Sequence, residues 1–174
     1  MNAKAAYLEF SATRHVPLFG QPWWLDAIRG PEGWGVSVAS ESGQAVGFLP
    51  YAYGRALMGL HAGLVMPKVT QFIGPWIAYP EGQKYTTRLA YEKRVMCQLI
   101  DGLPLFDWFS LRFHYSVSNW LPFYWRGFRQ STRYTYLLRD IHDLDSVYAG
   151  IASNLRNKIR RAQRHVHVTC SDHA

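Results

Sequence analysis

Two short stretches of alternating residues, joined by a turn, constrain the fold of this chain most. Residues 34–40 read WGVSVAS, residues 41–44 read ESGQ, and residues 45–54 read AVGFLPYAYG. A period of two places successive side chains on opposite faces of a strand, so the pattern predicts an antiparallel hairpin. Pro50 has no backbone N–H to donate, and we therefore expect a bulge or a sheet edge at that residue.

Helical patterns flank this hairpin. Residues 19–30 predict a short helix, with Pro22 at its first position and Gly30 as its stop. Residues 83–104 predict a longer helix whose apolar side consists of Leu89, Val95, Met96, Leu99 and Ile100. Further strands are expected at 68–80, with an interruption at Gly74-Pro75, and at 106–116, where both faces alternate and we expect both to be covered. The pattern of residues 57–67 is ambiguous.

The last third of the chain continues this alternation of strands and helices. Residues 131–140 predict a strand, and a helix follows from an Asp143 N-cap to about residue 164. Gly150 is expected to divide this helix in two, with Ser153 as a second cap, and residues 166–170 predict a final strand. The whole order predicts an α/β fold with a mixed sheet flanked by helices.

The net charge of +7 is unevenly distributed. Residues 126–164 contain nine cations and three anions, which favours polyanionic partners such as nucleotides, RNA or an anionic membrane. Arg156, Arg160 and Arg164 recur at a spacing of four and would form one stripe on a helix, with Arg161 beyond it. A phosphate site and a solvated face stabilised by the helix dipole explain this stripe about equally well.

Aromatic side chains are dense, with 7 Trp, 11 Tyr and 9 Phe among 174 residues. Residues 119–128 (NWLPFYWRGF) predict a short aromatic helix, in which Tyr124 and Trp125 could form a ligand platform. Trp76 lies beside the Gly74-Pro75 bend, where a bulged strand could direct it into a cleft. Packing in the core is the more common use of such residues.

Several classes of site find no support in the sequence. Two cysteines give no disulfide framework, the histidines do not cluster as metal ligands, and no P-loop, dinucleotide or G-x-S-x-G motif is present. Asp107 and His114 are the candidate general bases, although structural roles suit both better. No signal-peptide pattern and no apolar run of about 18 residues occur, so we expect a cytoplasmic protein.

Several segments together resemble the FemAB-like branch of the GNAT acyltransferase superfamily. The segments that carry the resemblance are FGQPWWLDAI, GFLPY, VTQFIGPWIAYPEGQKY, EKRVMCQLI, LPLFDWFSLRFHYSVSNWLPFYWRGFRQSTRYTYLLRDI and NLRNKIRRAQR. The resemblance implies two GNAT-like folds in tandem, of which the first helps to bind the acceptor. It implies transfer of an acyl or aminoacyl group from acetyl-CoA or aminoacyl-tRNA to an amine of a cell-envelope or polysaccharide precursor.

This chain departs from the family pattern in two ways. No segment fits the Q/R-x-x-G-x-G/A loop that binds the CoA pyrophosphate, and the chain ends where a second fold would begin. We therefore expect a GNAT-like first domain over residues 1–140 and a truncated stub of a second over 141–174. The expected contacts to an anionic or nucleotide-linked precursor are Trp76, Tyr124, Trp125, Arg156, Arg160 and Arg161.

Two other functions remain open from the sequence. The chain could be a non-catalytic binding module that forms a homodimer, or pairs with a separate second half, through exposed C-terminal elements. An RNA-binding role, including contact with tRNA, rests only on the positive charge of residues 126–164.

Overall fold

The computed structural model describes residues 2–56, 59–138 and 141–169. The chain divides into two compact units, Met1–Gln130 and Ser131–Ala174. The boundary expected from the sequence, at residue 140, lies within the second of these units.

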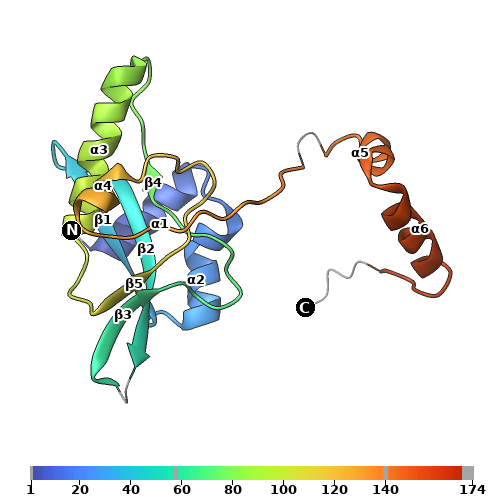
Figure 1. The fold of residues 1–174 in the computed structure, drawn as a ribbon. Helices are drawn as coiled ribbons and strands as arrows, with labels where there is room; N and C mark the ends of the chain where they lie inside the picture. Colours follow the sequence, from blue (N-terminus) through green and yellow to red (C-terminus); the bar gives the residue numbers. More distant parts are fainter. Residues whose placement is uncertain (1, 57–58, 139–140, 170–174) are drawn as a thin grey trace. The chain divides into compact units, whose positions relative to one another are not determined.

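The first unit is a mixed α/β structure (Figure 1). Its elements, in chain order, are α1 (Ala3–Thr13), the 3₁₀ turn η1 (Leu18–Gly20), α2 (Pro22–Arg29), β1 (Trp34–Glu41), β2 (Gln44–Ala56), β3 (His61–Val65), β4 (Trp76–Ile77), α3 (Tyr85–Asp101), β5 (Trp108–Ser110) and α4 (Leu121–Trp125). The predicted helix at 19–30 is confirmed as α2, which begins at Pro22 and ends at Gly30. Gly30 has a φ of 72°, a left-handed conformation that favours glycine.

The sheet contains both antiparallel and parallel pairs. β1 and β2 form the predicted antiparallel hairpin, and β2 continues into antiparallel pairing with β3. β4 also pairs with β2, whereas β5 runs parallel to β3 after the chain has crossed over through α3. The expectation of a mixed sheet flanked by helices is therefore confirmed for this unit.

Pro50 occupies a gap on one side of β2. Its partner in β1 is Val36, while the other side of β2 pairs with β4 only through Phe48 and with β3 only from Ala52. The bulge in this hairpin falls between Ala39 and Ser40 instead. Pro50, which has no N–H to donate, therefore lies at a local edge of the sheet. Of the two expected alternatives, the sheet edge is confirmed and the bulge at this residue is not.

Two hydrophobic clusters cover opposite faces of the β1–β2 hairpin. One cluster joins α1 and α2 to the sheet through Tyr7, Leu25, Trp34, Val36, Phe48, Ile73 and Trp76. The other joins α3 and α4 to the sheet through Ala39, Leu49, Tyr91, Val95, Met96, Leu99, Ile100 and Phe123. Side chains on the two faces of β1 therefore pack in two different cores, because helices cover both faces of the sheet.

The predicted strand at 106–116 is shorter in the structure. β5 ends at Ser110, and only an isolated parallel bridge between Ile73 and Phe113 follows it. Between them, the backbone amide of Arg112 donates to the Met66 sulfur at 3.2 Å instead of to a strand carbonyl. The strand pairing is therefore interrupted near Arg112. Ser110 and Arg112 are exposed, so the expectation that both faces of this strand are covered along its whole length is wrong.

The second unit contains two helices, α5 (Leu144–Gly150) and α6 (Ser153–Ala162). The Asp143 cap is confirmed, because its carboxylate accepts a hydrogen bond from the Ser146 amide at 3.0 Å. The break after Gly150 is also confirmed. The proposed Ser153 cap is wrong, since Ala152 occupies the N-cap position and Ser153 is the first helical residue.

Both strands predicted in the second unit are wrong for the residues that the structure describes. Residues 131–138 and 166–169 have no strand pairing, and Tyr134 and Tyr136 are 95% and 99% exposed. β-propensity alone does not form a strand, because the backbone groups need a neighbouring strand as partner. Residues 139, 140 and 170, at the ends of these predictions, lie outside the described residues.

In the described parts of the chain, no helix combines the length and the apolar character needed to cross a membrane.

Candidate functional site

An open pocket of about 570 Å³ lies in the first unit beside the first half of α3. Its lining residues come from the end of the β4 segment, from α3 and from the segment that leads into α4. They are Tyr79, Tyr85, Arg88, Leu89, Glu92, Ser116, Ser118, Asn119, Trp120 and Leu121. The volume is in the range of small-molecule sites, and the mixture of aromatic and charged side chains suits a polar ligand.

Tyr79 organises the two charged residues of the pocket. Its hydroxyl donates a hydrogen bond to Glu92 Oε2 at 2.8 Å, and the Arg88 guanidinium lies 4.2 Å from its ring centroid. Arg88 and Glu92 are one helical turn apart on α3, so they present neighbouring positive and negative groups. Burial, together with the hydrogen bond and charge of Glu92, raises the pKa of Tyr79, which keeps the phenol protonated as a donor.

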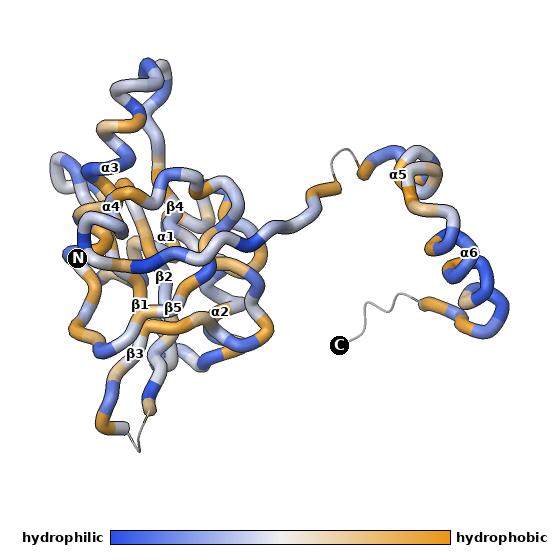
Figure 2. The backbone as a smooth tube through the Cα atoms, viewed as in Figure 1, coloured by the Kyte–Doolittle hydropathy of each residue, from blue (hydrophilic) through white to orange (hydrophobic). Residues whose placement is uncertain are grey.

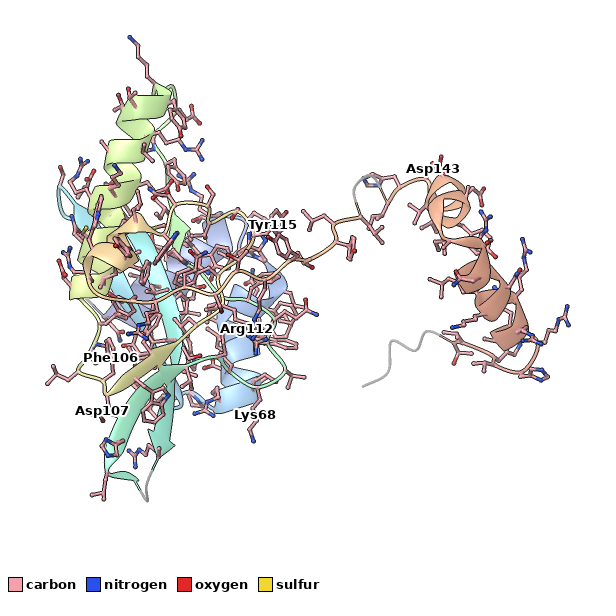
Figure 3. The ribbon with its side chains drawn as sticks, in the orientation of Figure 1. Lys68, Phe106, Asp107, Arg112, Tyr115 and Asp143 are labelled. Atoms are coloured by element: carbon pink, nitrogen blue, oxygen red, sulfur yellow. The ribbon has the colours of Figure 1, made fainter. Side chains whose placement is uncertain are left out.

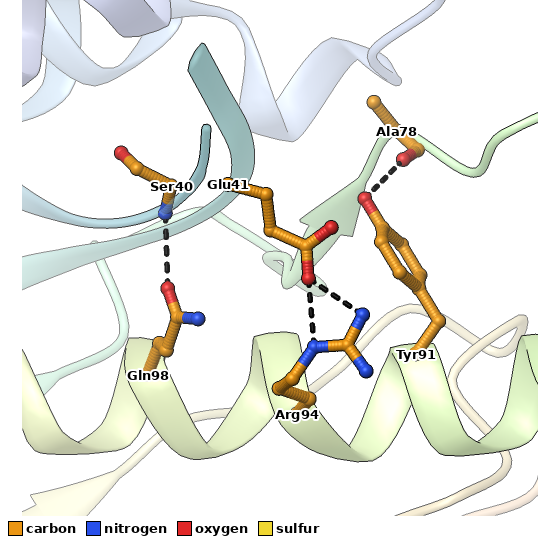
Figure 4. Close-up of polar contacts among 6 residues, drawn as sticks. All are labelled: Ser40, Glu41, Ala78, Tyr91, Arg94 and Gln98. Atoms are coloured by element: carbon orange, nitrogen blue, oxygen red, sulfur yellow. Dashed lines mark hydrogen bonds and ion pairs between the residues drawn. The ribbon is translucent and has the colours of Figure 1, made fainter. Parts of the chain in front are cut away.

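The position of α3 is fixed by contacts with the sheet. The Tyr91 hydroxyl donates to the Ala78 carbonyl at 2.9 Å, and Arg94 pairs with Glu41 at 2.7 Å (Figure 4). Farther along the helix, Gln98 accepts a hydrogen bond from the Ser40 amide at 3.0 Å. These contacts hold the helix that carries Arg88 and Glu92, and therefore set the geometry of the pocket.

The opposite wall of the pocket is formed by residues 116–121. Trp120 is half-buried and packs edge-on against Tyr124, with 5.5 Å between ring centroids. The Asn119 side-chain nitrogen is buried and has no hydrogen-bond partner among the described residues. The pocket thus combines a carboxylate, a guanidinium and aromatic surface, which together can bind a ligand that carries both an amine and an anion.

His114 lies next to this wall and contacts it through Ser116. Its Nδ1 is 2.7 Å from the Ser116 hydroxyl oxygen, and Phe72, Trp76 and Tyr115 surround its ring. Burial, with a smaller contribution from His15, lowers the pKa of His114. His114 is therefore neutral near pH 7, in the protonation state that a general base requires.

Asp107, the other candidate base, has a structural position at the start of β5. Its Oδ2 accepts a hydrogen bond from the Ala62 amide at 2.7 Å and lies 3.4 Å from His61 Nδ1. Figure 3 shows Asp107 beside β3 and β5, and it does not line the pocket. Its carboxylate joins the ends of two neighbouring strands.

The three expected aromatic contacts are in different surroundings. Trp76 is 8% exposed and belongs to the core beneath α1 and α2, where its ring packs against Gly20. Tyr124 and Trp125 are 59% and 53% exposed on α4, and neither lines the pocket directly. Trp120, from the same aromatic stretch at residues 119–128, lines the pocket instead.

The expected arginine contacts all lie on α6 in the second unit. Arg156 donates from Nη1 to the Ala149 carbonyl at 2.7 Å, so it links α6 to the end of α5. Arg160 and Arg161 are exposed, and none of the ion pairs among the described residues involves an α6 cation.

The sequence patterns did not identify Tyr79, Arg88, Glu92 or Asn119. The spacing of Arg88 and Glu92 on the polar side of the predicted helix was a usable signal. It gave no indication of Tyr79 or Asn119, because these residues reach the pocket only through the tertiary fold.

Comparison of the chain with protein-family models, with curated proteins and with solved structures gave no match. Within the described residues, no three His, Cys, Asp or Glu side chains come together as metal ligands.

Proposed function

We propose that this chain belongs to an acyl- or aminoacyl-transferase that modifies an amine of a cell-envelope or polysaccharide precursor. In this proposal the pocket beside α3 binds the acceptor. The observation that carries it is the pair of Arg88 and Glu92 held around Tyr79, facing the wall that contains Asn119 and Trp120. The resemblance to FemAB-like GNAT proteins supports the same reaction class, and a mixed α/β sheet is compatible with it.

The charges of the pocket suit an acceptor of this kind. An unreacted amine is an ammonium near neutral pH, and the half-buried Glu92 carboxylate can receive it. Arg88 can bind a phosphate or carboxylate of the same precursor, and Trp120 offers an apolar face for a ring. The acceptor class is therefore a small polar molecule or head group with a primary amine close to an anion.

The proposed reaction forms an N–C bond between the amine and the acyl carbonyl carbon. The C–S bond of acetyl-CoA or the C–O bond of aminoacyl-tRNA breaks, and the thiol or hydroxyl leaving group takes up the proton that the amine releases. The amine must lose its proton before it attacks, so orientation and deprotonation are the main tasks of the protein. In this proposal the donor site lies outside the pocket.

Binding of a simple probe tests the pocket. We expect D-glucosamine 6-phosphate, which carries an amine and a phosphate, to bind in isothermal titration calorimetry. Glu92→Gln and Arg88→Gln should each weaken binding roughly tenfold or more, because each removes a charge-assisted hydrogen bond. Glu81→Gln and Arg55→Gln remove the same charges from exposed positions outside the pocket and should leave binding unchanged.

A transfer assay tests the reaction class. The chain is incubated with an amine acceptor and either acetyl-CoA or aminoacyl-tRNA, and acylation is followed by mass spectrometry. Acylation that Glu92→Gln reduces would support the proposal. Probe binding without any transfer would show that this chain alone binds the acceptor without catalysing transfer, and failure of both probe binding and transfer would reject the proposal.

A second candidate is a non-catalytic assembly module. The specific observation that favours it is the exposure of apolar side chains in the second unit, including Leu144 at 72% and Leu155 at 49%. This function predicts that the chain self-associates as its concentration rises, which sedimentation velocity would detect.

A further inference from the structure

We propose that residues 144–168 bind an anionic membrane surface, lying along it as a basic amphipathic segment. This inference uses the second unit alone and does not depend on the proposed transferase activity. Three features of the segment carry it: its apolar face, its cations and the absence of acidic residues beyond its first turn.

The apolar face is continuous along α6, and within the second unit no residue of it is fully buried. Leu155, Ile159 and Ala162 recur at spacings of four and three, which places them on one side of the helix. Leu155 is 49% exposed, and Val166 and Val168, after the helix, are 57% and 85% exposed. Figure 2 shows hydrophobic positions alternating with strongly hydrophilic ones along this segment. Such a face gains free energy when it leaves water.

The cations occupy the remaining faces of the same helix. Arg156, Lys158, Arg160, Arg161 and Arg164 lie within nine residues, and no Asp or Glu occurs from 146 to 169. On α6, Arg160 lies on the side away from Leu155, and Lys158 flanks the apolar side, where a long side chain can reach lipid phosphates. Arg164 follows the end of the helix at Ala162. A high charge next to a narrow apolar face is typical of helices that lie at a membrane interface.

α5 adds further apolar residues to the segment. Arg156 donates to the Ala149 carbonyl at the end of α5 and links the two helices. Val147 and Tyr148 are half-buried, whereas Leu144 is 72% exposed. The apolar residues of the segment thus continue past the break at residues 151–152.

An anionic membrane fits these features better than RNA or a second copy of the chain. RNA would contact the arginines but leave Leu155 and Ile159 in water, and Tyr148 is the only Phe, Tyr or Trp from 144 to 168 that could stack on a base. A second copy paired through the apolar faces would add its own cations and supply no Asp or Glu from residues 146–169 to neutralise them. An anionic membrane neutralises the cations and buries the apolar face in one interface.

Vesicle flotation with the full chain tests the proposal. We expect binding to vesicles of phosphatidylcholine with phosphatidylglycerol, and at least tenfold weaker binding to phosphatidylcholine alone. The double variant Arg160→Gln/Arg161→Gln should weaken partitioning severalfold and by at most about 30-fold, since a basic residue at an anionic surface contributes about fivefold and these two lie away from the apolar face. Leu155→Gln/Ile159→Gln, with its charge unchanged, should weaken it by about tenfold or more.

Matched controls separate this site from general basicity. Arg129→Gln/Arg133→Gln removes the same charge from exposed positions outside the segment and should retain wild-type binding within about twofold. Circular dichroism checks that every variant keeps its helix content. Equal losses from both arginine pairs would overturn the proposal, because the attraction would then depend only on net charge.

Competing partners give distinct results. Tight binding of a single-stranded RNA that needs Arg160 and Arg161 but not Leu155 and Ile159, without vesicle binding, would overturn the proposal in favour of RNA. A concentration-dependent dimer that Leu155→Gln/Ile159→Gln abolishes, again without vesicle binding, would overturn it in favour of self-association.

Discussion

α3 and α6 each have an apolar face, yet only the face of α3 is buried within its own unit. In α3, Val95 and Leu99 are fully buried against the sheet, whereas in α6 Leu155 is 49% exposed and no residue is buried. Among the described residues, every buried side chain belongs to the first unit. An apolar face on a helix therefore indicates that the helix needs a packing partner, but it does not indicate which other element provides that partner.

Strand formation depends on a packing partner in the same way as helix burial. β1 and β2 form because each provides backbone partners for the other and because helices cover both faces. Residues 131–138 have comparable β-propensity but no neighbouring strand, and they remain without strand pairing. Stability is therefore concentrated in the first unit.

Removal of a large apolar side chain should affect the two helices very differently. We expect Leu99→Ala to lower the free energy of unfolding by about 2–5 kcal/mol, because it opens a cavity in a fully buried cluster. Leu155→Ala should change it by less than about 0.5 kcal/mol. Urea denaturation followed by far-ultraviolet circular dichroism, which detects the helices of both units, measures both values, and equal losses would show that α6 also packs in a core.

The space around a glycine also differs between the two units. A Cβ at Gly47 would lie 2.5 Å from Val95 Cγ1, so this glycine allows α3 to approach β2 closely. Val95 is β-branched and has little rotamer freedom on a helix, and Gly47→Ala should therefore cost about 1–3 kcal/mol.

Gly150→Ala is the matched substitution in the second unit. A Cβ at Gly150 meets no atom within 4 Å, and alanine favours a helix by about 1 kcal/mol. We expect increased helix content by circular dichroism and an unchanged urea midpoint for the first unit. A lowered midpoint would contradict the independence of the two units.

The smallest expected effect concerns the ion pair between α4 and α3. Arg126 donates to both carboxylate oxygens of Asp101, at 2.9 and 2.7 Å, and this hydrogen bonding lowers the pKa of Asp101 from its ordinary value of 3.8. A lowered folded-state pKa contributes stability above the unfolded value, and this contribution is lost as the pH falls through the folded one. Because both groups are exposed, Asp101→Asn should lower the urea midpoint only slightly near neutral pH.

The pH dependence identifies the cause of that effect. The difference between wild type and Asp101→Asn should disappear as the pH falls well below 3.8, where the wild-type carboxyl is also protonated. A difference that persists in acid would indicate a packing effect of the substitution and not loss of the ion pair.

Local sequence patterns predicted much of the first unit. Pro22 and Gly30 marked helix boundaries correctly, and the alternation of residues 34–54 predicted the β1–β2 hairpin. These signals depend on each segment's own backbone preferences and burial pattern, so they can be recognised without the rest of the fold.

The pocket could not be predicted in the same way. Tyr79 meets Arg88 and Glu92 only because Tyr91 and Arg94 fix α3 against the sheet, and Asn119 arrives from a later segment. The sequence instead drew attention to Trp76, whose large side chain fills the core. An aromatic residue beside a bend has the same local pattern whether it faces a ligand or the interior.

Hydrogen–deuterium exchange of the full chain, without lipid or ligand, tests the central contrast most directly. We predict strong protection of the amides in β1, β2 and the second half of α3, and exchange at least about a hundredfold faster in α6. Addition of anionic vesicles should slow exchange in α6 and leave the first unit unchanged. Protection of α6 equal to that of α3 in the free protein would contradict the account, because it would mean that the apolar face of α6 is already buried.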